Sequence, residues 1–160
     1  TITRMYEEGT PPKIVVCDGI QDIRNIGAIS RSCLAFGVDL MIVGVKANAE
    51  IGEGAIKSSA GALLTLPVAR VSSLSDTINY LKSWGLKQIA TTEKAEKELS
   101  ADIFSELDAW VLWMGNEDKG ISKERLALMD ETVRINMPGK IDSLNVSVAT
   151  GIVLHQLTCK

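Results

Sequence analysis

The sequence contains little of what several common kinds of protein site require. It has one histidine, His155, and three cysteines, Cys17, Cys33 and Cys159, which lie far apart and form no CxxC pair. A zinc site built from these residue types would have too few ligands close together, and no cluster of carboxylates suggests another metal. Scattered cysteines are typical of a reducing compartment, where they pack as small apolar side chains. We interpret His155, on a late apolar segment, as a packed or surface residue.

Long apolar runs and an excess of positive charge are also absent. No apolar run approaches the ~18 residues that a membrane-spanning helix needs, and residues 1–12 lack the charged-then-apolar order of a signal peptide. The 17 basic and 20 acidic residues give a formal net charge of −3. This balance disfavours a protein that coats nucleic acid nonspecifically, but it is compatible with a local basic site. We therefore expect a cytoplasmic protein without a membrane segment.

The usual nucleotide and hydrolase motifs are missing. No GxGxxG follows the first apolar segment, and segment 52–54 (GEG) lacks the third glycine. Segment 115–122 (GNEDKGIS) has the glycine spacing of a P-loop, but Ile121 stands where the phosphate-binding lysine is required. No GxSxG occurs. These absences argue against a kinase or GTPase, a Rossmann-type dinucleotide enzyme and a serine hydrolase.

What is present fits one globular α/β domain. The 160 residues are 46% apolar and 23% charged, as in a domain that buries its own core. Residues 1–12 are polar and end in Pro11-Pro12, so we expect a tail or linker there and a domain over residues 13–160.

Short apolar segments alternate with amphipathic ones along the rest of the chain. The pattern predicts strands at residues 14–17, 40–45, 64–68, 88–91, 110–114 and 133–135. It predicts helices at residues 26–36, 51–60, 74–84 (capped by Ser73), 123–129 and 144–157. This alternation favours an α/β fold with a mostly parallel sheet flanked by helices on both faces. Ligands of such sheets bind beyond the carboxyl ends of the strands.

Three segments that follow predicted strands combine polar residues with glycines, which permit close approach of the backbone to a ligand. They are 25–31 (NIGAISR), 114–122 (MGNEDKGIS) and 135–149 (INMPGKIDSLNVSVA). Together they resemble the motifs NxGxxxR, GxExxG[LI]S and PxxG…SLNVSVA of the SpoU (TrmH-like) branch of the SPOUT RNA methyltransferases. Segment 57–62 (KSSAGA) resembles the SAGA segment of that family. The resemblance covers about residues 13–158; Arg24, Met114 and Asn136 depart from the residues frequent at their positions.

The resemblance implies transfer of a methyl group from S-adenosylmethionine to a ribose 2′-hydroxyl of RNA. It also implies a deep C-terminal trefoil knot, a cofactor site in the knotted loops, and an active site shared across a homodimer. The layout from Asp18 to segment 143–154 (SLNVSVATGIVL) resembles most closely the enzymes that methylate guanosine of ribosomal RNA, which we favour over tRNA. This chemistry requires no metal. Many members carry an N-terminal RNA-binding domain, and if this chain is cut from a longer protein, it is the catalytic domain of a two-domain enzyme.

Five candidates for catalysis follow from the motif positions: Arg31, Asn25, Glu117, Ser143 and Asn145. The family implies that Arg31 contacts RNA phosphate and assists removal of the 2′-proton, with the substrate's help, since a guanidinium is a poor base. Asn25 would orient Arg31 or the RNA backbone, or cap its helix. Glu117 would anchor its loop or hold Arg31. We expect Ser143 to cap the last helix and Asn145 to point toward the cofactor or the ribose, with a purely capping role for both as the alternative.

The binding residues are assigned in the same way. Cofactor contacts are expected from Thr91, Gly115, Ile135, Met137 and Leu144, and the apolar ones among them suit a flat adenine ring. RNA is expected to meet a local basic patch formed by Arg24, Arg31, Lys57 and Lys140.

The last predicted helix is apolar on more than one side, so a monomer would expose apolar surface. This pattern predicts a homodimer, in agreement with the family. Two alternatives remain open. One is a catalytically inactive module that binds RNA or S-adenosylmethionine, and the other is a small-molecule enzyme of doubly wound fold, for which no motif speaks.

Overall fold

The fold is built on one parallel sheet. Within residues 1–46 and 48–159, which the computed structural model describes, six strands pair in the order β3-β2-β1-β5-β4-β6, all of them parallel. Their bounds are β1 Lys13–Asp18, β2 Leu40–Gly44, β3 Val68–Val71, β4 Lys87–Thr91, β5 Trp110–Gly115 and β6 Glu131–Val133. The predicted α/β architecture with a mostly parallel sheet is confirmed.

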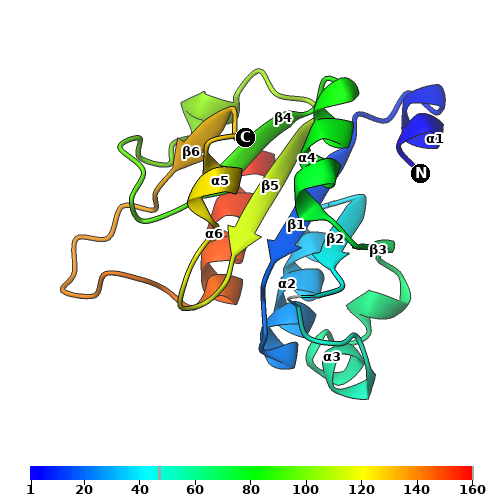
Figure 1. Ribbon diagram of the computed structural model, residues 1–160, viewed down its shortest axis with the longest axis horizontal. Coiled ribbons are helices and arrows are strands. Elements are labelled where there is room, and N and C mark those ends of the chain that lie inside the picture. Colours follow the sequence, from blue (N-terminus) through cyan, green and yellow to red (C-terminus); the bar gives the residue numbers. More distant parts are fainter. Residues whose placement is uncertain (47, 160) are drawn as a thin grey trace.

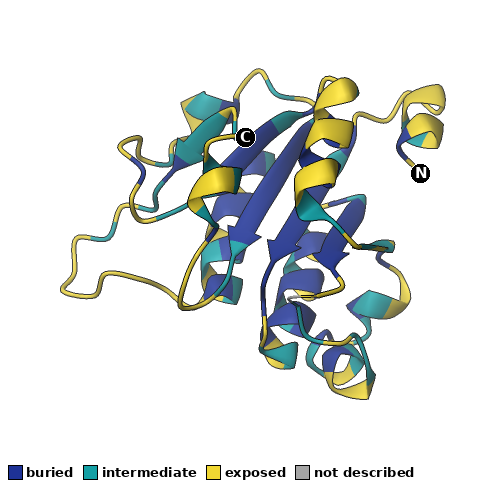
Figure 2. Cartoon of the chain, in the orientation of Figure 1, coloured by how far each residue is buried: buried dark blue, intermediate teal, exposed yellow. Residues whose placement is uncertain are grey.

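The centre of the sheet is apolar on both faces, as parallel strands covered by helices require. Residues 14–17 of β1 and 111–113 of β5 are fully buried, and Figure 2 shows the central strands as the buried interior of the molecule. β1 lies between β2 and β5, so the strand order reverses beside it. Such a switch point opens a crevice at the carboxyl ends of the two strands.

Helices cover the sheet on both faces (Figure 1). On one face, α2 Ile23–Ala35, α3 Glu53–Ser58, α6 Val146–Thr158 and the 3₁₀ turn η2 Ala101–Phe104 pack on a core that includes Ile29, Phe104 and Leu154. On the other face, α1 Ile2–Glu7, α4 Leu74–Ser83 and α5 Lys123–Leu126 pack on a second core. A 3₁₀ turn, η1 Ala62–Leu64, follows α3. Together these elements leave the loops after the strands free to form a site.

The segment expected to be a tail or linker contains α1. A helix of six residues is too short to be stable alone, and tertiary contacts hold this one. Ile2 is buried in the second core, and the Tyr6 ring stacks on Trp84 with ring centroids 5.8 Å apart. Tyr6 also donates from its hydroxyl to the Trp84 carbonyl, at 3.2 Å. Neither contact can be inferred from the local pattern of residues 1–12.

Several predicted boundaries are wrong by a few residues. The third strand begins at Val68 rather than residue 64, because Pro67 has no N–H to donate and contributes only its carbonyl, to Met41. The sixth strand ends at Val133, which places Ile135 in the loop beyond it. The helix predicted at 51–60 is shorter and spans α3. The last helix begins at Val146 rather than at residue 144.

The cysteines separate into two kinds. Cys17 and Cys33 are buried in the first core, as expected, and burial raises the pKa of Cys17 to about 12 and that of Cys33 well above its ordinary value. These thiols therefore remain protonated and inert at neutral pH. Cys159 is exposed, contrary to the expectation of burial, because it follows the last residue of α6.

The contact between α2 and α3 yields a test of the fold. A β-carbon at Gly27 would lie 2.6 Å from the carbonyl oxygen of Ala55 and would overlap the Ser58 side chain. We expect Gly27→Ala to lower the free energy of unfolding by about 1–3 kcal/mol, the usual cost of overpacking. Urea denaturation measures this change. Gly52→Ala is the matched control, because no atom lies within 4 Å of its added carbon. Equal midpoints for the two variants would contradict the close packing.

Candidate active site

The site forms where the carboxyl ends of β1, β4 and β5 and the loop after β6 meet at one end of the sheet (Figure 1). Parallel strands bring these ends together although they are far apart in sequence. Asp18 and Gly115, the last residues of β1 and β5, are paired in register. The predicted motifs at 25–31 and 114–122 therefore begin side by side.

A chain of hydrogen bonds joins all three motifs. Asn145 donates from Nδ2 to Oδ1 of Asn25, at 3.1 Å, and Asn25 donates from its own Nδ2 to Oε1 of Glu117, at 3.0 Å. Glu117 also accepts the backbone N–H groups of Gln21 and Asp22, at 3.3 Å each. The first, second and third motifs are thus held by one continuous network of polar side chains.

The direction of this chain follows from the cap of α6. Asn145 accepts the backbone N–H of Ser147 at 2.9 Å and that of Val148 at 3.4 Å with its Oδ1, as well as the Ser147 hydroxyl at 2.6 Å. Its Nδ2 is therefore the group that faces Asn25 and must donate. The Asn25 oxygen then accepts, which leaves its amide nitrogen to meet the Glu117 carboxylate.

Glu117 is held as a carboxylate. Burial raises its pKa, but hydrogen bonds from Asn25 and from backbone amides outweigh this effect and leave the pKa below its ordinary value. A carboxylate with a lowered pKa that already accepts several hydrogen bonds is a poor general base at neutral pH. Its geometry instead suits it to anchor the second motif against the start of α2.

A pocket opens beside this network. Its lining includes all five residues expected to contact the cofactor, and also Glu117 and Ser143 of the catalytic candidates. The walls combine apolar side chains with polar loop atoms; the lining residues are Thr91, Thr92, Glu93, Met114, Gly115, Asn116, Glu117, Gly120, Ile135, Met137, Asp142, Ser143, Leu144, Val146 and Ala149. The structure thus brings the predicted cofactor residues together, while their binding role remains a prediction.

The pocket has the chemistry that S-adenosylmethionine requires. Thr91 Oγ1 is buried and has no hydrogen-bond partner within the described part of the chain, so it is available to a ligand. Position 115 accommodates only a glycine, because a β-carbon there would lie 2.5 Å from the carbonyl carbon of Gly120. Apolar residues such as Ile135 suit an adenine ring, and the carboxylates in the lining suit a cationic sulfonium or ammonium group. The residues present therefore fit this cofactor.

Two catalytic candidates take roles other than those expected. The expectation that Ser143 caps the last helix is wrong, because Asn145 is the cap and Ser143 is an exposed residue of the pocket wall. The cap lies at Asn145 because its short amide side chain reaches the free N–H groups of the first turn. Asn145 also turns its Nδ2 toward Asn25. It is therefore a structural link between α6 and α2.

Arg31 stands apart from the network. It is exposed, and its side chain makes no hydrogen bond or ion pair with any residue in the ranges 1–46 and 48–159. Glu117 and Asn25, expected to hold or orient it, bond to each other instead. Arg31 lies one turn after Gly27, whose face packs against α3, so a free guanidinium is displayed beside that helix.

The other basic candidates are exposed as well. Arg24, seven residues before Arg31 on α2, pairs with Asp22 at 2.7 Å and is exposed. Lys57 lies in the last turn of α3, the helix against Gly27. Lys140 is exposed in the loop that leads to α6. A residue every seven positions on a helix shares one face, so Arg24 and Arg31 are displayed together.

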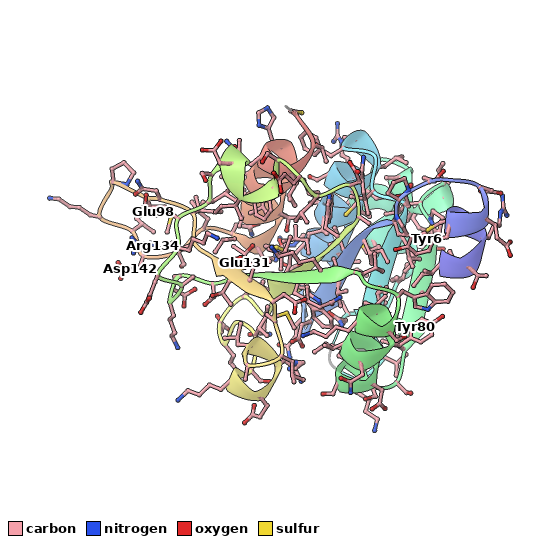
Figure 3. The ribbon with its side chains drawn as sticks, turned by 90° about the horizontal axis from the view of Figure 1, so that it is seen from above. Tyr6, Tyr80, Glu98, Glu131, Arg134 and Asp142 are labelled. Carbon is pink, nitrogen blue, oxygen red and sulfur yellow. The ribbon has the colours of Figure 1, made fainter. Side chains whose placement is uncertain are left out.

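Sequence patterns do not single out Asn116, Glu93 or Asp142. Asn116 donates to the Gly19 carbonyl at 2.7 Å and accepts the N–H groups of Asp118 and Lys119, so it folds its own loop. An asparagine before a glycine-containing turn is a signal for such a role. Glu93 and Asp142 come from loops whose approach no local pattern reveals. Figure 3 shows Asp142 at one end of the molecule, with Tyr6 and Tyr80 at the other.

The described ranges contain no group of three or more His, Cys, Asp and Glu side chains able to hold a metal ion. Among the helices in these ranges, none combines the length and apolar character needed to cross a membrane.

His155 is exposed and its ring packs edge-on against Phe36, with centroids 6.0 Å apart. The structure therefore gives it a surface position, as predicted.

Comparison with known proteins gives a consistent picture. A relative from Mycobacterium avium, described as an uncharacterized tRNA/rRNA methyltransferase, is 37% identical over 151 residues, which cover 94% of this chain and 48% of the relative. The chain thus spans about half the length of the curated relatives it matches. The SpoU methyltransferase AviRb from Streptomyces viridochromogenes, solved with AdoMet, superposes with a TM-score of 0.84 at 28% identity, covering 93% of this chain and 60% of that one.

A crystal structure described as an RNA 2′-O ribose methyltransferase superposes with a TM-score of 0.78 at 27% identity, covering 92% of this chain and 56% of that one. The profile of the SpoU rRNA Methylase family matches residues 12–155. This match includes all three motifs and every strand of the sheet. The chain belongs to the SpoU rRNA methylase family.

Proposed function

We propose that this chain binds S-adenosylmethionine and methylates a ribose 2′-hydroxyl of RNA. The observation that carries the proposal is the pocket that gathers all five expected cofactor residues beside the Asn145–Asn25–Glu117 chain. Membership of the SpoU family and the similarity to an AdoMet-bound methyltransferase support it. The similarity to a 2′-O ribose methyltransferase supports the choice of the ribose oxygen.

The charges of the site favour two ligands of opposite sign. Glu93, Glu117 and Asp142 line the pocket, and among its described lining residues none is Lys or Arg. The basic candidates Arg24 and Arg31 are exposed outside it. A cationic sulfonium is attracted to the pocket, while the phosphates of RNA are attracted to the surrounding surface.

In this reaction we assign a positioning or charge role to four residues: Glu117, Asn25, Arg31 and Ser143. S-adenosylmethionine supplies an electrophilic methyl group, so catalysis depends on alignment and on the nucleophilicity of a weak hydroxyl. Glu117 and Asn25 fix the pocket wall relative to α2. Arg31, with its guanidinium free, would bind phosphate and favour loss of the 2′-proton by its positive charge. Ser143, exposed in the wall, would donate to the ribose or the cofactor.

The proposal extends to assembly and to substrate. Val148 and Ile152 lie one turn apart on α6 and form an exposed apolar stripe, with exposed fractions of 52% and 37%. Covering this stripe with a second copy would bury apolar surface and bring another protomer to the site, as in the family.

Ribosomal RNA, modified at guanosine in the cytoplasm, remains the favoured substrate. A trefoil knot formed by the loops around α6 belongs to the same proposal.

The activity is tested with labelled S-adenosylmethionine and total RNA from a strain that lacks this gene, followed by mapping of 2′-O-methyl ribose. We expect label in one RNA size class and a loss of at least about 100-fold with Arg31→Ala, the usual contribution of a group that assists proton transfer. Arg70→Ala, an exposed arginine at the β3 edge, is the matched control. Cofactor binding without methylation of any RNA would favour the inactive binding module.

The basic patch is tested by the salt dependence of RNA binding. Lys140→Ala and Arg24→Ala should each reduce the slope of log K against log salt by about 0.7 for each phosphate that the side chain neutralises in the wild type. The Arg70→Ala variant should keep the wild-type slope. Unchanged slopes for both patch variants would remove Lys140 and Arg24 from the RNA surface.

The dimer is tested by sedimentation. Val148→Glu places a charge on the apolar stripe, so we expect this variant to sediment as a monomer and to lose methyl transfer while remaining folded. Leu128→Glu changes an exposed leucine near α5, on the other face of the sheet, and should stay dimeric. A wild-type chain that sediments as a monomer at micromolar concentration would contradict the shared site.

A further inference from the structure

An ion pair outside the pocket joins the last residue of β1 to α5, the helix that follows the second motif. Arg125 of α5 donates from Nε to Oδ2 of Asp18 at 2.6 Å and from Nη2 to Oδ1 at 3.0 Å. The pair is bidentate, which fixes the orientation of both groups. The Asp18 side chain is 4% exposed and that of Arg125 is 28% exposed. The carboxylate therefore lies inside the protein.

This ion pair is linked to both ends of the 116–122 loop, so it affects the position of that loop. Asp18 pairs in register with Gly115, where the loop begins, and Arg125 follows the loop on α5. Ser122, at the end of the loop, accepts the Arg125 backbone N–H at 3.4 Å. Asn116, at the start of the loop, donates to the Gly19 carbonyl at 2.7 Å. One end of the loop is thus tied to Gly19, just after β1, and the other is tied through Arg125 to Asp18, the last residue of β1.

The other side of this loop is the pocket wall. Gly115, Asn116, Glu117 and Gly120 all line the pocket. The backbone folds back tightly, because Gly120 donates its N–H to the Asn116 carbonyl at 2.9 Å. A shift of Arg125 and α5 would therefore move the wall that is expected to contact the cofactor.

Stability alone does not account for the pair. Burial is the largest influence on Asp18 and leaves its pKa above the ordinary value, although the hydrogen bonds and charge of Arg125 act to lower it. Replacing a buried ion pair by neutral groups of similar size is often neutral or stabilising, whereas removal of one partner is strongly destabilising. A buried pair of this kind is better suited to fixing a geometry than to adding stability.

We propose that Asp18 and Arg125 are positioning residues that hold the 116–122 loop in the conformation that binds S-adenosylmethionine. The pair touches neither the pocket nor the reacting atoms, and it acts through Gly115, Asn116 and Glu117. This inference rests on the proposed function, because it concerns affinity for the cofactor of that same site.

The test separates position from stability by comparing Arg125→Met with the double variant Asp18→Asn/Arg125→Met. Arg125→Met leaves a buried carboxylate without a partner, so we expect a lower melting temperature together with weaker cofactor binding. The double variant removes both charges, so we expect its melting temperature to return close to that of the wild type. Calorimetric titration with S-adenosylmethionine should still show a dissociation constant raised about tenfold, because the loop is no longer fixed.

A second ion pair, distant from the site, provides the matched control. Arg4→Met with Glu8→Gln removes an arginine–carboxylate pair of 2.7 Å between α1 and its C-cap residue and should leave the dissociation constant unchanged. In methyl transfer, the double variant at Asp18 and Arg125 should show a raised KM for S-adenosylmethionine with a smaller change in kcat. Arg125→Lys should restore little, since an ammonium cannot reproduce the bidentate geometry.

Two results would contradict the proposals, and they are distinguishable. A double variant that recovers both melting temperature and wild-type affinity would overturn the positioning role and make the pair a structural element only. A wild-type chain that is folded but does not bind S-adenosylmethionine would overturn the proposed function instead, and this inference with it.

Discussion

The parallel pairing of β1 with β5 is the constraint on which the site depends. These strands are nearly a hundred residues apart in sequence, yet Asp18 and Gly115 end them side by side. The pairing places the start of α2 against the 116–122 loop, and it lets Glu117 accept from backbone and side chain of the opposite segment. The hydrogen bonds from Asn145 to Asn25 and from Asn25 to Glu117 depend on this adjacency. Parallel strands make it possible, because their carboxyl ends must lie at one edge of the sheet.

Two layers of polar interactions fix the loop between β5 and α5. On the pocket side, Glu117 is bound by Asn25, and Asn25 is bound by Asn145 at the start of α6. On the opposite side, Arg125 is bound by Asp18. Both layers consist of groups that would be costly to bury without partners. These hydrogen bonds hold the loop together with the burial of Ile121 in the second core.

The sequence predicts the architecture well because the strands are continuous apolar runs and the helices are amphipathic. The wrong predictions concern the boundaries of elements and residues 1–12, and each has a physical cause. β3 begins only after Pro67, because a residue without an N–H cannot donate to the strand ladder. The helix α1 depends on the stacking of Tyr6 on Trp84, which is distant in sequence. At the site, motif positions identify residue types that the structure gathers in one pocket, but they do not predict partners. That Asn145 caps α6 and binds Asn25 depends on tertiary geometry, which no spacing within one segment encodes.

The separation of charge makes a net charge of −3 compatible with the polyanionic substrate proposed for this chain. Three acidic side chains line the pocket, where Glu117 is fixed by hydrogen bonds and stays ionised. Arg31, by contrast, is exposed and has no partner among the described residues. An exposed arginine without a partner among the described residues keeps its full capacity for a phosphate, whereas one paired with Glu117 would have to give up that interaction first. The network that occupies Glu117 therefore leaves Arg31 available, which is the arrangement that an RNA-binding methyltransferase requires.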